Sequence, residues 1–132
     1  MTDQAQLVLV ISDAAEERLF IEGACAQAFA VRCAASVEEG LVTARRIQPA
    51  VVVMAVRGGS PDAWVASRRL KADPLTARTP VVVITAAAPE RRALRESRAD
   101  VTLPYPADEA GQQDFGATLV RTLVTLASAR GS

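Results

Sequence analysis

Histidine is absent from this chain of 132 residues, and Lys71 is its only lysine. Without histidine, the chain can have neither His-based acid–base catalysis nor a His-ligated metal site. Its two cysteines, Cys25 and Cys33, are too few for a disulfide framework or a zinc site, and we expect Cys25 to be a small core residue. We therefore expect no cofactor.

A signal peptide and a membrane-spanning run are also missing. Residues 1–6 are polar and carry no basic region ahead of an apolar stretch, and no apolar run reaches the length of a membrane span, about 20 residues. Fifteen Lys and Arg residues balance 15 Asp and Glu residues, and this zero net charge disfavours nucleic acid or an anionic membrane as a partner. We expect a cytoplasmic protein that binds neither.

The composition is that of a globular domain, because 50% of the residues are hydrophobic and 23% are charged. The length indicates a single domain over residues 1–132, with residues 6–129 or so ordered. Neither an internal repeat nor an interdomain linker interrupts it.

Five apolar runs predict β-strands at residues 7–11, 29–34, 50–57, 81–84 and 101–103. The main runs are continuous rather than alternating, which is typical of strands buried on both faces of a parallel sheet. The central run, 50–57, is entered from Pro49 and left through Gly58-Gly59, and both flanks are turn signals.

Helices are predicted between these runs and after the last one. Two of them have capping-box spacing, Asp13 with Glu16 and Ser36 with Glu39. The expected helices cover about 14–28, from Ser36 to before Pro49, from Asp62 to about 73, 89–98, and from a start between 108 and 114 to about 129.

The apolar side chains of the first and last helices predict which faces pack inward. In the first helix we expect an inner stripe of Leu19, Ile21, Ala24, Cys25 and Ala28. In the last helix we expect a core face of Phe115, Leu119, Leu123 and Leu126, with Val120 and Val124 to one side. We expect Trp64, near the start of the third helix, to be a packing anchor.

Strict alternation of strand and helix with right-handed crossovers predicts an α/β fold. The natural arrangement is the flavodoxin-like (βα)5 fold, a doubly wound five-stranded parallel sheet with strand order 2-1-3-4-5. Functional groups of such sheets collect at the carboxyl ends of the strands. Ala55 lies at that end of the central strand, and its side chain is only a methyl group.

At this point the sequence resembles the receiver domain of bacterial two-component response regulators over nearly its whole length. The strongest similarity is at residues 69–86 (RLKADPLTARTPVVVITA), which look like the family's third helix, fourth strand and conserved hydroxyl. Weaker matches are Glu38-Glu39-Gly40-Leu41 with Pro49, Asp62-Ala63-Trp64, and Ala99-Asp100 with Pro106.

The resemblance implies a phosphorylation site with an acceptor aspartate, two acids that hold Mg²⁺, a hydroxyl and a lysine. These positions fall, in that order, on Ala55, on Ile11 and Ser12 (or Ser12 and Asp13 after a one-residue shift), on Thr85 and on Tyr105. Only the hydroxyl is retained with certainty. Asp13 is a weak candidate for a metal ligand, because Mg²⁺ needs several oxygen ligands.

The resemblance therefore implies a degenerate pseudo-receiver, which is not an enzyme and is not phosphorylated at this position. The nearest other acceptors, Ser60 and Asp62, lie beyond the strand, and Asp62 already has a role as a helix cap.

In the family, signals leave through the face formed by helix four, strand five and helix five. Here that face would hold Arg91, Arg92, Arg95, Tyr105, Val120, Arg121 and Val124. Arginine is favoured at interfaces, so the partner is expected to be a signalling protein, the chain's own output domain or a second copy in a homodimer. The alternative interpretation is that these arginines only solvate an exposed helix.

Two other functions stay open. A small-ligand or anion sensor would use the crevice near Ser12, Ser60 and Thr85, although Gly58-Gly59 is no phosphate-binding loop by itself. An enzyme of the same fold ranks last, because the sequence offers no histidine and no paired acids.

Overall fold

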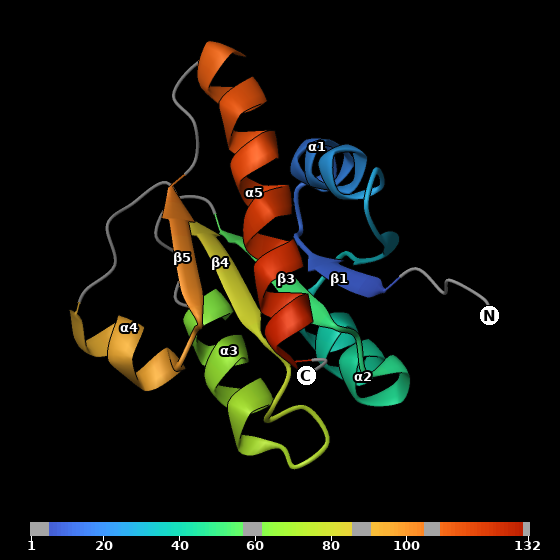
Figure 1. The fold of residues 1–132 in the computed structure, drawn as a ribbon. Coiled ribbons are helices and arrows are strands. Elements are labelled where there is room, and N and C mark those ends of the chain that lie inside the picture. The colour runs from blue at the N-terminus through green and yellow to red at the C-terminus, as the bar shows by residue number, and fades with distance from the viewer. Residues whose placement is uncertain (1–5, 57–61, 86–90, 105–108, 131–132) are drawn as a thin grey trace, which may run out of the picture.

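The computed structural model describes residues 6–56, 62–85, 91–104 and 109–130. Strands and helices alternate along the described residues, as the sequence predicts (Figure 1). The elements are β1 (Leu7–Ile11), α1 (Ala15–Cys25), β2 (Ala30–Ala34), α2 (Val37–Ile47), β3 (Val51–Val56), α3 (Asp62–Ala72), β4 (Val81–Thr85), α4 (Arg91–Ser97), β5 (Val101–Pro104) and α5 (Glu109–Arg130).

The strands form one parallel sheet in the order β2-β1-β3-β4-β5, which confirms the predicted flavodoxin-like topology. β3 lies in the middle of the sheet and pairs with β1 and β4. Helices α1 and α5 cover one face, while α2 and α3 cover the other, and α4 lies beside α3 (Figure 1).

The residues of β3 explain why its sequence is apolar without alternation. Val51, Val53 and Ala55 belong to the core cluster under α1 and α5, whereas Val52 and Met54 belong to the cluster under α2 and α3. Because successive strand side chains point to opposite faces, a strand covered by helices on both sides must be apolar throughout.

The second helix begins as predicted. The Ser36 hydroxyl accepts a hydrogen bond from the Glu39 N–H at 3.1 Å, and the Glu39 carboxylate accepts one from the Ala35 N–H at 3.2 Å. These bonds satisfy N–H groups that have no partner inside the helix.

The start of the first helix differs from the expectation. Its N-cap is Ala14, which makes no side-chain cap, and Asp13 is exposed, so the predicted capping box of Asp13 with Glu16 is wrong. The Ser12 hydroxyl accepts a hydrogen bond from the Ala14 N–H instead, at 3.2 Å. The turn before α1 is therefore held by the residue that ends the strand.

The inner stripe of α1 is also partly wrong, because Leu19 is 68% exposed and the helix ends at Cys25, before Ala28. The buried residues of α1 are Glu17, Ile21 and Cys25, at intervals of four residues. Leu19 is two residues from Ile21 and so lies on another side of the helix.

The last helix packs as predicted. Phe115, Leu119 and Leu123 are buried, and Leu126 packs against the same cluster. The ring of Phe115 stacks on Phe20 of α1 with centroids 6.1 Å apart, which joins the two helices on that face. Trp64 packs against the other cluster, as a packing anchor would. Among the described residues no helix is both long and apolar enough to cross a membrane.

Candidate functional site

The carboxyl ends of the strands bring several of the predicted site residues to one edge of the sheet. Ile11 ends β1 and pairs with Met54, while Ala55 pairs with Ile84. Thr85 ends β4, opposite Val56 on one side and Pro104 on the other. Tyr105 and Ser60 lie outside the described residues, as does the side chain of Asp62.

Apolar side chains fill this edge where an acidic site would need carboxylates. Ala55 is only 8% exposed and belongs to the core cluster under α1 and α5. Ile11 is 3% exposed and belongs to the cluster on the opposite face. The hydrophobic core therefore extends on both faces to the end of the sheet.

The side chain of Ile11 packs closely against α2 at Gly40. A Cβ atom built on Gly40 would meet Ile11 Cδ1 in a severe overlap and would lie 2.6 Å from Ile11 Cγ1. Gly40 is buried, so the isoleucine occupies the space that any other residue at position 40 would need. The isoleucine and the glycine fit each other as a pair.

Ser12 precedes the turn into α1 and is 2% exposed, and its N–H, carbonyl and hydroxyl groups all make hydrogen bonds. Its N–H donates to the Ala34 carbonyl, its carbonyl accepts from Arg18 Nη1 at 2.7 Å, and its hydroxyl lies 3.3 Å from Glu17 Oε2. The hydroxyl that the resemblance places at a metal ligand thus holds the end of β1 to the first turn of α1.

Glu17 is the acidic residue at this edge that the sequence did not reveal. It is 6% exposed and is hydrogen-bonded to the Ser12 hydroxyl, whereas Asp13 points to solvent. The four-residue spacing from Glu17 to Ile21 and Cys25 was the signal that could have found it. Within the described ranges, no group of three or more Cys, Asp or Glu side chains is arranged to hold a metal ion.

Thr85, which the resemblance places at the conserved hydroxyl, is 6% exposed. It ends β4, between β3 and β5. A hydroxyl at this place can donate one hydrogen bond and accept others, but it brings no charge.

The only lysine of the chain, Lys71, is hydrogen-bonded at the amino ends of the strands, opposite the carboxyl edge. Lys71 Nζ donates to Asp100 Oδ2 at 2.7 Å and to the Thr79 carbonyl at 2.9 Å, and Asp100 Oδ2 also accepts from the Val81 N–H at 2.7 Å. Val81 begins β4, whereas the carboxyl edge lies at Thr85. Lys71 therefore cannot supply a positive charge to the carboxyl edge.

The described residues of the expected interaction face lie on α4 and α5 (Figure 1). Arg91, Arg92 and Arg95 are exposed on α4, and Arg92 is paired with Glu96 at 2.9 Å. On α5, Val120 is half-buried, Arg121 is exposed and Val124 is 45% exposed.

The sequence matches no protein-family model and no curated protein. Solved structures do match, among them the chemotaxis protein CheY4 of Vibrio cholerae, with 19% identity and a TM-score of 0.77 over 94% of this chain and 99% of that one. The signal receiver domain of a histidine kinase from Syntrophus aciditrophicus has 17% identity and a TM-score of 0.78, over 95% and 92% of the two chains. The phosphorylated cyanobacterial phytochrome response regulator RcpA has 15% identity and a TM-score of 0.75, over 91% and 94%. The chain has the fold of response-regulator receiver domains.

Proposed function

We propose that this chain is a receiver-type module of two-component signal transduction that acts by contact with a protein partner and takes no phosphoryl group at the end of β3. The observation that carries the proposal is the apolar carboxyl edge, where Ala55 and Ile11 are 8% and 3% exposed. An alanine methyl has no oxygen that a phosphodonor can modify. We infer that the module is not an enzyme.

The charges around this edge support the same proposal. Phosphoryl transfer to a carboxylate needs Mg²⁺, and Mg²⁺ binds oxygen ligands that are mostly carboxylates. Here Glu17 is the buried carboxylate near the end of β1, and it is held by the Ser12 hydroxyl. Lys71 is held at the other edge by Asp100. Among the residues that the structure describes, this edge thus lacks the set of charges that would bind a metal ion and a phosphoryl group together.

The partner would be a signalling protein, an output domain of the same polypeptide or a second copy of the chain. The surface we propose for this contact combines the exposed arginines Arg91 and Arg95 of α4 with Arg121 and Val124 of α5. An arginine-rich surface with an exposed valine fits a partner that offers carboxylates around an apolar centre.

A small-ligand sensor that uses the carboxyl edge is the second candidate. The buried polar pair of Ser12 and Glu17 favours it, because such a pair could recognise a polar group. We rank it below the first proposal, since the Ser12 hydroxyl already has two partners inside the protein.

The decisive experiment exposes the purified chain to acetyl phosphate and Mg²⁺, with RcpA as the positive control because its solved structure is of the phosphorylated form. We expect no increase in intact mass and no change in the sedimentation coefficient of this chain, because it has no acceptor at Ala55. A phosphoryl group on any residue of β3 or its flanking turns would refute the proposal, whether it is stable in acid or not.

A further inference from the structure

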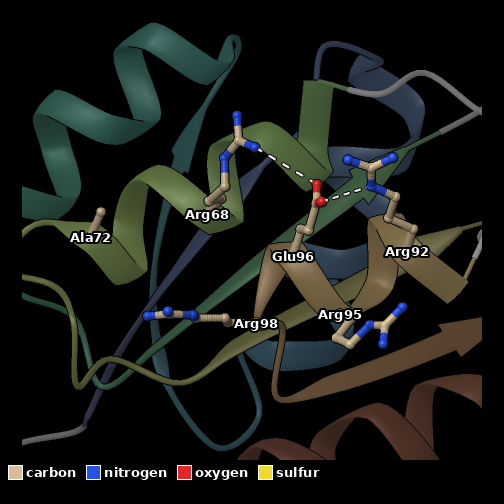
Figure 2. Close-up of a pocket in the computed structure, with 6 residues that line it drawn as sticks. All are labelled: Arg68, Ala72, Arg92, Arg95, Glu96 and Arg98. Carbon is tan, nitrogen blue, oxygen red and sulfur yellow. Dashed lines mark hydrogen bonds and ion pairs between the residues drawn. The ribbon is translucent and has the colours of Figure 1, made fainter.

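A cleft between α3 and α4 is lined mainly by arginines. Its volume is about 500 Å³, and it is lined by Arg68, Ala72, Arg92, Arg95, Glu96 and Arg98 (Figure 2). Four arginines and one glutamate line it, which gives a net formal charge of +3 in a chain whose total charge is zero, and two of the arginines, Arg68 and Arg92, are directed to the Glu96 carboxylate. A neutral protein has concentrated positive charge in one concave place.

The fold fixes the two walls of this cleft. On α3, Arg68 and Ala72 are four residues apart and so share one face of the helix. Beneath them, the Ser67 hydroxyl donates a 2.7 Å hydrogen bond to the Ser97 carbonyl at the end of α4, and both serines are buried. Because this bond is shielded from water, it holds α4 at a set distance from α3.

Arg98 is placed in the cleft by an unusual backbone conformation. It follows α4 directly and has a φ of 56°, in the left-handed region that few residues other than glycine adopt. Figure 2 shows its side chain extending from the end of α4 toward α3, on the side of Ala72. The arginine thus completes the lower wall of the cleft although its backbone conformation is costly.

Glu96 neutralises only part of the charge. It lies between Arg92, at 2.9 Å, and Arg68, at 3.9 Å (Figure 2). The hydrogen bond and the charge of Arg92, with smaller contributions from Arg68 and Arg95, lower the pKa of the Glu96 carboxyl, so it stays ionised at neutral pH. Within the described ranges, no carboxylate lies within ion-pair distance of Arg95 or Arg98.

We propose that this cleft binds a small anion with two adjacent phosphoryl groups, either inorganic pyrophosphate or the diphosphate of a nucleotide. Guanidinium groups bind phosphate oxygens through paired hydrogen bonds, and several of them around one cleft suit a multiply charged anion better than a single phosphate. The volume lies within the range of small-molecule sites, of roughly 300–1,000 Å³. This proposal does not depend on whether the chain can be phosphorylated at the end of β3.

The test is a calorimetric titration of the whole chain at low salt with pyrophosphate, ADP, AMP and orthophosphate. We expect pyrophosphate and ADP to bind, and AMP and orthophosphate to bind at least about tenfold more weakly because they offer one phosphoryl group. Equal affinities for pyrophosphate and ADP would mean that the diphosphate alone is recognised, whereas tighter binding of ADP would mean that the nucleoside also contacts the cleft.

Charge-removal variants locate the site. Arg68→Gln and Arg98→Gln, which lie outside the proposed partner surface, should each weaken pyrophosphate binding about tenfold. Arg91→Gln is the matched control, because Arg91 is an exposed arginine of α4 that does not line the cleft, and it should leave the affinity unchanged. All three side chains are exposed, and circular dichroism checks that each variant is folded.

Two results would overturn the proposal. One is the absence of pyrophosphate binding to the wild-type chain at low salt. The other is an equal loss of affinity in Arg91→Gln, which would show diffuse attraction to a basic surface rather than a site. Neither result bears on phosphorylation, which concerns the carboxyl ends of the strands.

Discussion

The contact between Ile11 and Gly40 leads to a prediction about stability with two opposing terms. Replacing Gly40 by alanine inside α2 should gain about 1 kcal/mol of helix propensity. The new Cβ atom, however, would overlap Ile11 Cδ1 and lie 2.6 Å from Cγ1 and 3.2 Å from Cγ2. Movement of the Cδ1 methyl alone cannot relieve these contacts, because Cγ1 and Cγ2 are fixed to a β-branched carbon.

The cost of overpacking should exceed the gain in helix propensity. Overpacking of a buried site costs about 1–3 kcal/mol, and Ile11 is 3% exposed among side chains that leave it no free volume. The net effect of Gly40→Ala should therefore be a loss of up to about 2 kcal/mol in the free energy of unfolding. In an Ile11→Ala background, which itself costs about 2–4 kcal/mol, the same change should instead stabilise by about 1 kcal/mol.

Urea unfolding of the wild type, the two single variants and the double variant, followed by circular dichroism, measures a coupling energy that we expect to be about 1–3 kcal/mol. Gly23→Ala is the matched control, because Gly23 lies inside α1 and a Cβ there would meet nothing within 4 Å. It should stabilise the protein by about 1 kcal/mol. If Gly40→Ala has the same effect with and without Ile11, the edge is not packed as described and the reasoning fails.

Two further predictions concern Lys71 and the cysteines. Lys71→Met should lower the free energy of unfolding by about 1–2 kcal/mol, less than for a fully buried pair because Asp100 is 37% exposed; an unchanged urea midpoint would contradict a structural role for the lysine. Cys33 should react slowly with a disulfide reagent at pH 8, with a rate that rises about tenfold per pH unit, because burial and then the hydrogen bond to Glu22 raise the pKa of its thiol to about 11. Glu22→Gln should speed that reaction by removing the negative charge of Glu22, which also raises the pKa of the thiol, and a fast wild-type reaction at pH 8 would refute the assignment.

The fold could be predicted from the sequence because burial leaves a plain pattern in this chain. Strands such as β3 are covered on both faces and are apolar throughout, and Ser36 with Glu39 is a start signal that acts within four residues. Both patterns are local, so no knowledge of distant contacts is needed to interpret them.

The details at the carboxyl edge were harder to predict from the sequence, because they depend on the exact residue at which α1 begins. Glu17 shares a helix face with Ile21 and Cys25, and its partner, the Ser12 hydroxyl, is available only because the helix starts after Ala14. A buried glutamate runs against the usual preference of charged residues for the surface. An error of one residue in the start of the helix is enough to hide it.

The cleft between α3 and α4 could not be predicted, since Arg68 and Arg98 are 30 residues apart and each looks like an ordinary surface charge. Tertiary contacts such as the hydrogen bond between Ser67 and Ser97 bring their helices together. Charges that converge from separate elements leave no periodic pattern in the sequence.

Together the two ends of the sheet restrict where an anion could act on this molecule. One end is held by Lys71, Asp100 and the start of β4, and the other is filled in its described part by Ile11 and Ala55, with the buried Glu17 hydrogen-bonded to Ser12, so the described residues offer no cluster of positive charge to an anion at either end. A ligand shifts a conformational equilibrium only by its different affinity for the two states. If the chain responds to an anion, the response should therefore start at the helix surfaces. The α3–α4 junction is the place where such an anion would change the balance of charge, because it joins two helices whose facing arginines repel one another.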